Sequence, residues 1–358
     1  MIRTRLGKDG PFVSAIGLGT WGLGGRFTAD ARHDDLCVDA IRMGLDLGLT
    51  LIDTAEAYGA GHTERLVGRA IRGRRSDVCI ATKVSPEHLR PEDVVRAVEG
   101  SLGRLGIDCI DLYQIHWPNS SVPIEESLGA MDRLIEQGKV RFIGLSNFGC
   151  RGLAKALSCA GHPVVALQTE YNLFDRTIEN DLLPFCRKAG MGLIAYSPLD
   201  QGHSPTRGMA AETLAGIAEK HGRTVAQVIL NWLARVQGVV PIPKAGNPAH
   251  LRENAAALDF ALDEEDVGAV DRAFAPRPAA IPAWRVRADT KGLENFVPGP
   301  DDLARDIVAG EAIKPIRVVP APDDPGRFDL VEGKLRYWAW VRAMGTERAV
   351  PALVRQPA

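Results

Sequence analysis

Short apolar runs alternate along the chain with segments whose apolar residues recur at helical spacing. The runs are rich in Val, Ile and Leu, which favour strands. Because each run is followed by a helix-like segment, the pattern predicts parallel strands joined by helical crossovers. The expected strands cover residues 13–20, 49–53, 78–83, 110–116, 140–146, 164–170, 191–197 and 238–243.

The helix-like segments support the same fold. In residues 34–48 the helical period places Leu36, Ala40, Met43 and Leu47 on one face. The segment at residues 91–106 opens with Pro and two acidic residues, which is typical of the first turn of a helix. Eight alternations of strand and helix predict an α/β fold, a (β/α)8 TIM barrel, which usually takes about 250 residues.

The chain has 358 residues, so it is longer than such a barrel. We expect the barrel over residues 1–275, a Pro/Ala-rich hinge with the first part of the tail over 276–298, and a small α+β domain over 299–358. In that last domain we expect a helix at 299–310, a strand at 313–321, a hairpin-like turn at 322–333, a helix at 334–345 and a strand at 348–355.

Composition narrows the class of protein. Hydrophobic residues make up 45% and charged residues 25%, which is enough to bury a sizeable core. The net charge of -2 offers no general attraction to nucleic acid or to an anionic membrane. Six scattered cysteines without a CxxC pattern indicate free thiols in a reducing compartment and no metal site. With no run of 18 apolar residues, we expect a soluble, cytoplasmic protein.

Ionisable residues stand where the predicted strands end. Asp53 ends the second strand and Tyr58 follows in its loop, while Lys83 and His116 end the third and fourth strands. Each residue alone has a structural explanation, because "DTAE" resembles a capping box and strand-end Lys or His side chains are often solvated. Together they would meet at the C-terminal mouth of the barrel, where the active site of this fold lies.

These four residue types suit proton-coupled hydride transfer. A free tyrosine has a pKa of about 10, and a nearby ammonium group lowers it. Lys83 could supply that charge while Asp53 holds it in place, so that Tyr58 becomes a general acid and base. His116 could donate a hydrogen bond to a substrate carbonyl. This pattern does not suggest acyl transfer.

The motifs that carry these residues resemble the aldo-keto reductase family over about residues 2–274. They include "GLGTWGLGG", "DTAEAYGAGHTERLVGRAI", "DLYQIHWP", "GKVRFIGLSNF", "LQTEYNLFDR", "AYSPL" and "PIPKAGNPAHLRENAAA". The resemblance implies a catalytic tetrad of Asp53, Tyr58, Lys83 and His116. It also implies an extended nicotinamide coenzyme across the mouth of the barrel and the reduction of an aldehyde or ketone to an alcohol, or the reverse.

The resemblance further implies which residues hold the coenzyme. The carboxamide would be held from the fifth and sixth strands, the pyrophosphate after the seventh and the adenosine after the eighth. The implied residues are Thr20 and Trp21 in the pocket, Ser146, Asn147 and Gln168 at the carboxamide, Tyr196 on the nicotinamide ring, Ser197, Pro198 and Leu199 at the pyrophosphate, Lys244 at the 2'-phosphate, and Glu253 and Asn254 at the adenine.

One position departs from the family pattern. The family often has Arg six residues after the lysine, where this chain has His250, and Ala245 replaces a frequent Ser or Thr. The bidentate contact that an arginine makes with phosphate is therefore missing, and Lys244 acts as a point charge. NADPH is the expected coenzyme, with NADH as the alternative.

The tail resembles the small domain shared by ParB-like proteins and sulfiredoxins. The resemblance rests on the order of its elements and on "EGKLR", residues 332–336, where Gly333 would open a phosphate-binding helix N-terminus. The tail lacks the cysteine that sulfiredoxin chemistry needs. Its acidic and basic residues nearly balance, which argues against DNA binding. Packing, a lid over the pocket or partner contact is one interpretation, and nucleotide or phosphate binding is the other.

Two classes of function follow. The first is an NAD(P)H-dependent oxidoreductase acting on a small-molecule carbonyl or alcohol, with a redox-neutral epimerase or eliminase that retains its coenzyme as a variant. The second is a nicotinamide-binding regulatory or scaffold protein whose tail binds a nucleotide or a partner. Neither involves a membrane.

Overall fold

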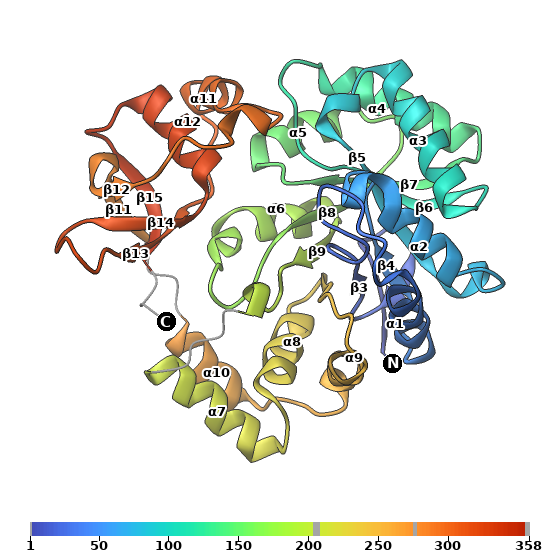
Figure 1. Cartoon of the computed structure of the whole chain (residues 1–358), viewed down its shortest axis with the longest axis horizontal. Helices are drawn as coiled ribbons and strands as arrows, with labels where there is room; N and C mark the ends of the chain where they lie inside the picture. The colour runs from blue at the N-terminus through green and yellow to red at the C-terminus, as the bar shows by residue number, and fades with distance from the viewer. Residues whose placement is uncertain (1, 203–207, 275–277, 355–358) are drawn as a thin grey trace.

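Eight parallel strands form one sheet in which each strand pairs with its neighbour in the sequence. Backbone hydrogen bonds from Gly17 N to Pro241 O (2.9 Å) and from Gly19 N to Pro243 O (3.1 Å) join the first strand to the last. The sheet is thereby closed into the predicted barrel (Figure 1). Its strands are β3 (Leu18–Gly19), β4 (Leu51–Asp53), β5 (Cys79–Val84), β6 (Ile110–Ile115), β7 (Val140–Ser146), β8 (Val164–Glu170), β9 (Gly192–Tyr196) and β10 (Val239–Pro241).

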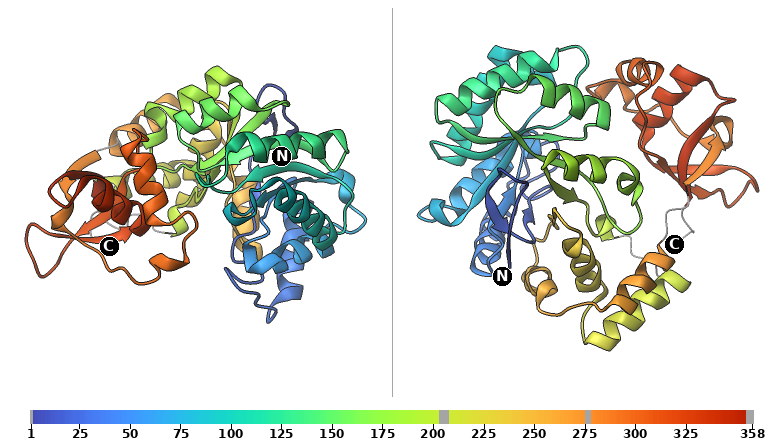
Figure 2. Two further views of the ribbon diagram at one scale, coloured as in Figure 1. Left: turned by 90° about the horizontal axis from the view of Figure 1, so that it is seen from above. Right: turned by 180° about the vertical axis from the view of Figure 1, so that it is seen from behind.

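The computed structural model describes residues 2–202, 208–274 and 278–354. Helices follow every barrel strand and surround the sheet, as the two further views in Figure 2 show. They are α1 (Asp34–Asp46), α2 (His62–Ala70), α3 (Pro91–Leu105), α4 (Ile124–Glu136), α5 (Cys150–Cys159), α6 (Leu182–Ala189), α7 (Met209–His221), α8 (Val225–Arg235), α9 (Pro248–Ala255) and α10 (Glu264–Ala273).

The buried face of α1 differs in part from the one that its spacing predicted. Ala40 is buried as expected, and Met43 and Leu47 are partly buried against the core, but 65% of Leu36 is exposed. The helix also buries Val38, Ile41 and Leu45, which are three and four residues apart. The prediction was wrong for Leu36 because α1 packs against both α2 and α9, so that neighbouring helices as well as the sheet determine which residues are covered.

The first predicted strand, residues 13–20, is two elements in the structure. Its beginning is β2 (Phe12–Ser14), which pairs antiparallel with β1 (Arg3–Arg5) in an N-terminal hairpin, and only its end enters the barrel as β3. Leu6 and Val13 of this hairpin are fully buried against the apolar interior of the barrel. Apolar residues therefore continue between β2 and β3, and for this reason their pattern alone predicts one strand.

The C-terminal residues form a separate five-stranded sheet with the strand order β11, β15, β13, β14, β12. The apolar residues of this sheet, among them Ile316, Val318 and Val350, form a core with Tyr337 that is distinct from the core of the barrel. The elements are β11 (Pro278–Pro282), β12 (Val286–Arg287), α11 (Pro300–Val308), β13 (Ile316–Pro320), β14 (Phe328–Glu332), α12 (Lys334–Met344) and β15 (Ala349–Val354).

This C-terminal domain begins earlier in the chain than the hinge prediction implies. β11 lies within residues 276–298 and pairs with β15 over five residues, while β12 of the same segment pairs with β14. Part of the segment expected to hold the hinge and the first part of the tail is therefore in the sheet, as β11 and β12. Residues 276 and 277 of that hinge, and residue 355 of the expected last strand, lie outside the described residues.

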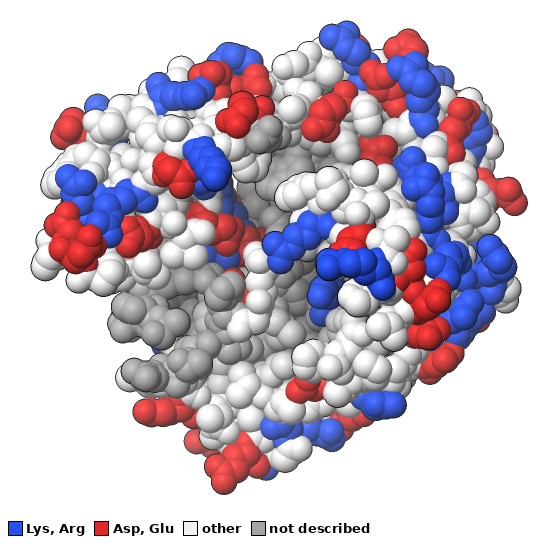
Figure 3. Space-filling model, in the orientation of Figure 1, with Lys and Arg blue, Asp and Glu red and all other residues white. Residues whose placement is uncertain are grey.

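The surface agrees with the balanced charge of the sequence. Basic and acidic side chains are interspersed over the face drawn in Figure 3. Among the described residues, no helix combines the length and the apolarity that crossing a membrane requires.

Candidate active site

The four predicted catalytic side chains lie together at the C-terminal mouth of the barrel. Lys83 Nζ is 2.8 Å from Asp53 Oδ2 and 3.1 Å from the hydroxyl of Tyr58. The rings of Tyr58 and His116 meet edge to face with their centroids 5.8 Å apart. Parallel strands place these residues side by side because β4, β5 and β6 are consecutive in the sheet.

The loop after β4 turns Tyr58 back over the mouth. Gly59, Ala60 and Gly61 have φ values of 57°, 52° and 83°, which are left-handed conformations that favour glycine. Gly59 N donates a hydrogen bond to Arg26 O at 2.7 Å, and a Cβ at Gly59 would lie 2.8 Å from Gly24 O. The "YGAG" run is therefore a tight reversal that a chain of larger residues could not adopt without strain.

Lys83 is fully buried and its ammonium group has three acceptors. Besides Asp53 and Tyr58, it donates to the backbone oxygen of Thr54 at 2.9 Å. Burial by itself would lower the pKa of Lys83, but the charge of Asp53 and the contact with Tyr58 outweigh it and raise the pKa above its ordinary value. Lys83 is therefore a charged group inside the barrel mouth at neutral pH.

The pKa of Tyr58 does not follow the expectation that Lys83 would lower it. Burial raises the pKa of Tyr58 more than the Lys83 charge lowers it, and Asp53 adds to the increase. The prediction was wrong in its net direction because the sequence shows the charged neighbour but not the loss of solvent. Tyr58 is consequently protonated at neutral pH, the state that a proton donor needs.

His116 is a neutral side chain in this site. Burial, reinforced by the positive charge of Lys83, lowers the pKa of His116 to about 3. A neutral imidazole still has one N–H group and can donate a hydrogen bond to a carbonyl oxygen. Its backbone nitrogen bonds to Val84 O at 3.0 Å, which fixes it to the neighbouring strand.

Several residues expected at the coenzyme contact the tetrad directly. Gln168 Nε2 donates to Asp53 Oδ1 at 2.7 Å, and Thr20 Oγ1 donates to Asp53 O at 2.8 Å. Trp21 packs edge to face on Tyr58 with ring centroids 4.8 Å apart, and Phe27 packs on Trp21 in turn. Both oxygens of the Asp53 carboxylate are thus engaged, so its orientation toward Lys83 is fixed.

The other residues expected at the nicotinamide form a second cluster. Asn147 donates from Nδ2 to His116 O (3.0 Å) and to Ser146 Oγ (3.1 Å), and its Oδ1 accepts from the Tyr196 hydroxyl at 2.9 Å. Asn147 has a φ of 64°, an uncommon conformation that these contacts support. Tyr196 is half-buried, so part of its ring remains available for stacking.

The remaining predicted residues lie along the loops after β9 and β10. Ser197 has a φ of 48°, and Pro198 and Leu199 continue the same loop. A backbone bridge pairs Lys244 with Gly19, so its exposed side chain lies beside the first barrel strand. His250 is exposed in the first turn of α9, whereas Glu253 is half-buried and Asn254 is buried.

A charged cluster at the edge of the mouth was not predicted from the sequence. Arg317 of β13 is buried against Glu170, Asp175 and Asp200 of the barrel loops. A signal for it exists in "PIRVV", where an arginine occupies a position of an apolar strand that should be buried. Its partners are not readable because they lie more than a hundred residues earlier.

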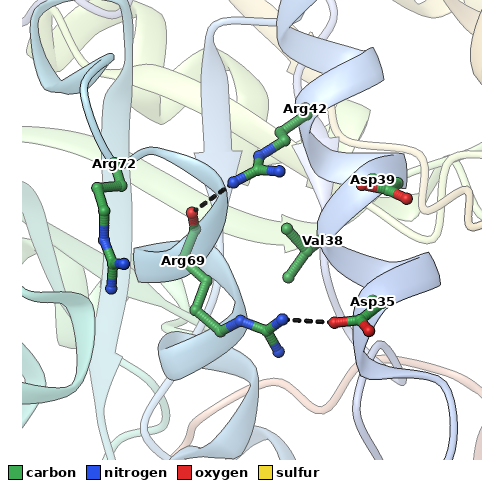
Figure 4. A pocket seen from close by; sticks show the side chains of 6 residues that line it. All are labelled: Asp35, Val38, Asp39, Arg42, Arg69 and Arg72. Atoms are coloured by element: carbon green, nitrogen blue, oxygen red, sulfur yellow. Dashed lines mark hydrogen bonds and ion pairs between the residues drawn. The ribbon is translucent and has the colours of Figure 1, made fainter.

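One hollow on the surface of the described residues lies outside this site. It has a volume of about 580 Å³ and lies between α1 and α2, lined by Val38 and by charged side chains that include Asp35, Arg42 and Arg69 (Figure 4). Arg69 pairs with Asp35 across it, and none of the tetrad residues lines it. Within the described part of the chain, no group of three or more His, Cys, Asp or Glu side chains is placed to hold a metal ion.

Comparison with known proteins identifies the barrel. The model of the aldo/keto reductase family matches residues 15–275. Methylglyoxal reductase YeaE of Escherichia coli is 40% identical over 268 residues, covering 74% of this chain and 92% of that protein. A probable aldo-keto reductase of Glycine max is 34% identical over 305 residues, with 74% and 86% covered.

Solved structures agree. A thermostable aldo-keto reductase, Tm1743, in complex with the inhibitor epalrestat superposes with a TM-score of 0.74 at 46% identity, over 76% of this chain and all of that one. An aldo/keto reductase from Klebsiella pneumoniae in complex with NADP and acetate gives 0.72 at 39% identity, over 77% and 96%. The chain therefore belongs to the aldo/keto reductase family.

Proposed function

We propose that this protein is an NADPH-dependent reductase that converts a small aldehyde or ketone into an alcohol. The observation that carries the proposal is the buried contact of Lys83 with Asp53 and Tyr58, at 2.8 and 3.1 Å. This contact places a protonated tyrosine beside a fixed positive charge at the mouth of a barrel. The family supports the same reaction.

The residues at the mouth fit the coenzyme. Tyr196 offers part of its ring for stacking, Asn147 and Gln168 offer amide groups, and Lys244 is an exposed cation beside the first strand. When bound, a dihydronicotinamide supplies the hydride. The crystal structures of two Klebsiella pneumoniae relatives contain NADP or NADPH, which supports a phosphorylated coenzyme here.

Each member of the tetrad then has a role in the proposal. Tyr58 donates the proton to the carbonyl oxygen as that oxygen gains charge, and His116 donates a hydrogen bond to the same oxygen. The Lys83 ammonium stabilises the tyrosinate that Tyr58 leaves behind. Asp53 holds Lys83 in position through its Oδ2.

The substrate class is small and carbonyl-containing. Trp21, Phe27 and the exposed Trp117 lie near the tetrad in sequence or in ring contact and would give the entrance an aromatic surface. The Escherichia coli relative is a methylglyoxal reductase. We therefore choose small aldehydes and α-dicarbonyls as the first compounds to assay.

The test is the Tyr58→Phe variant. The ring still packs on Trp21, so the site stays filled, but the proton donor is gone. We expect the kcat for NADPH-dependent reduction to fall by about 10²- to 10⁴-fold while the fluorescence-measured Kd for NADPH stays unchanged. Wild-type turnover by Tyr58→Phe would overturn the proposal.

For the C-terminal domain we propose the ParB-like or sulfiredoxin-like fold, with a packing role. Gly333, with a φ of 96°, opens α12 as that resemblance implies. However, Lys334 pairs with Asp289, and Arg336 donates to Pro315 O and Lys314 O. Because the basic side chains of this turn are engaged inside the domain, we favour contact with the barrel over binding of a nucleotide or a separate partner.

A cytoplasmic location also remains part of the proposal. The six cysteines are all free thiols in the structure, which suits a reducing compartment.

A further inference from the structure

A buried arginine of the C-terminal domain pairs with several carboxylates of the barrel. Arg317 is 1% exposed. Its Nη2 lies 2.6 Å from Glu170 Oε1 and 3.2 Å from Asp175 Oδ2. Its Nη1 lies 3.1 Å from Asp200 Oδ1 and 2.5 Å from Glu332 Oε2. Three of these four carboxylates belong to the barrel, so one guanidinium group joins the two domains.

A lysine from the same domain completes the contact. Lys314 Nζ lies 3.0 Å from Glu170 Oε2 and 2.9 Å from Asp175 Oδ2. Across residues 2–202, 208–274 and 278–354, the cations that pair with Glu170 and Asp175 both come from the C-terminal domain. Without that domain, two buried carboxylates would lose their counter-charges, which is unfavourable.

The positive charges of the cluster favour the ionised forms of Glu170 and Asp175. Burial would raise the pKa of Asp175, but Lys314, the Thr177 hydroxyl and Arg317 together lower it to about 2. The pKa of Glu170 is lowered by Lys314 and Arg317 against burial in the same way. Glu170 and Asp175 therefore face Lys314 and Arg317 as carboxylates, and the geometry of this contact depends on their pairing.

The barrel partners of Arg317 lie on the two loops next to the proposed coenzyme site. Glu170 is the last residue of β8 and is aligned with Tyr196 of β9. Gln168, which contacts Asp53, is two residues before Glu170 and so faces the same side of the strand. Asp200 follows the Ser197 to Leu199 run, where the family resemblance implies the pyrophosphate.

That run has a backbone that needs support. Ser197, Asp200 and Gln201 have φ values of 48°, 48° and 55°, although none is glycine. Asp200 N donates to Ser197 O at 2.9 Å, so the two ends of the turn are tied together. Arg317 holds Asp200 from the opposite side.

The same arginine reaches the other end of the turn indirectly. Asn172 Nδ2 donates to Ser197 O at 3.1 Å, and Asn172 Oδ1 accepts from the backbone nitrogen of Asp175 at 2.9 Å. Asp175 is in turn held by Arg317. One side chain of the C-terminal domain thus supports the turn through Asp200 and through Asp175.

We propose that Arg317 is a positioning residue for the coenzyme: through Asp200 and Asp175 it holds the 197–201 turn in the conformation that receives the pyrophosphate. The inference rests on the proposed function. It makes the C-terminal domain part of the coenzyme site, although Arg317 itself touches neither substrate nor coenzyme. A lysine could not replace this arginine, because the guanidinium group pairs with carboxylates on two different loops.

The experiment compares two arginines of the same domain. Arg317→Met removes the interdomain contact, whereas Arg287→Met removes an arginine that pairs with Asp323 and Asp329 inside the C-terminal domain. For Arg317→Met we expect the Kd and the KM for NADPH to rise about tenfold, with kcat at saturating NADPH changed much less. For Arg287→Met we expect the wild-type Kd and the wild-type KM for NADPH.

A second variant covers the case in which Arg317→Met does not fold. Asp200→Asn keeps the pairs of Arg317 with Glu170 and Asp175 but weakens the hold on the turn, so the Kd for NADPH should also rise. Arg317→Lys should restore only part of the affinity. Unchanged NADPH affinity in Asp200→Asn, or in a folded Arg317→Met, with a wild-type protein that binds NADPH, would overturn the inference alone. A wild-type protein that binds neither NADPH nor NADH would overturn the proposed function and the inference together.

Discussion

Lys83 Nζ donates a hydrogen bond to the hydroxyl of Tyr58 across 3.1 Å, and both groups are buried in the barrel mouth. The lysine is charged, and the tyrosine keeps its proton because burial opposes ionisation. The hydroxyl of Tyr58 therefore keeps its proton until a substrate oxygen accepts it, and the Lys83 ammonium favours that transfer. The pair therefore suits the reduction direction.

We expect Lys83→Met to lose both activity and stability. Without the ammonium group, the tyrosinate has no counter-charge, so kcat should fall by about 10²-fold or more. Asp53 would remain as a buried charge without its partner, at a cost of about 3–5 kcal/mol. Steady-state kinetics and urea denaturation measure the two effects separately.

The double variant Lys83→Met with Asp53→Asn is the matched control. It removes both charges, so most of the lost stability should return because no unpaired charge is buried. The activity should not return. If the single variant kept the wild-type kcat, Lys83 would have no part in the proton transfer.

We expect His116 to make the protein less stable as the pH falls. Its pKa in the folded state is about 3, below the ordinary value of histidine, so protons bind preferentially to the unfolded chain. The folded state is favoured fully above about pH 6.5, and about 1.4 kcal/mol is lost one pH unit below that value.

The measurement is the free energy of unfolding of wild type and His116→Gln across this pH range. Because other groups titrate alike in both proteins, the difference between them isolates His116. The wild type should lose stability relative to the variant below about pH 6.5. A difference that stays constant with pH would contradict a neutral, buried His116.

We expect His250→Arg to increase the preference for NADPH over NADH. Arginine at this exposed position of α9 could contact a 2'-phosphate with two hydrogen bonds, which the present histidine and Lys244 do not provide. The KM for NADPH should fall about tenfold, equivalent to about 1.4 kcal/mol.

NADH is the internal control, because it has no 2'-phosphate and its KM should not change. Lys244→Met tests the same site in the opposite sense and should raise the KM for NADPH alone. Equal effects of either variant on the two coenzymes would place these residues away from the 2'-phosphate.

The barrel and its tetrad were readable from the sequence because their signals are local. Each strand is a short apolar run, and parallel strands in chain order bring successive strand ends to one rim. Asp53, Lys83 and His116 could therefore be placed together without knowing any side-chain contact. The place of Tyr58 in the loop after the second strand was predicted too, and the glycines beside it have the left-handed conformations of that loop.

Tertiary structure decided what depends on burial and on distant partners. The sequence shows that Lys83 can act on Tyr58, but the loss of solvent that raises the pKa of Tyr58 exists only in the folded barrel. Arg317 reads as an anomaly in an apolar strand until folding brings it to Glu170 and Asp200, more than a hundred residues away. Local patterns determine strands, turns and their order; the electrostatics of a buried site and the joining of two domains arise from packing, which no local pattern encodes.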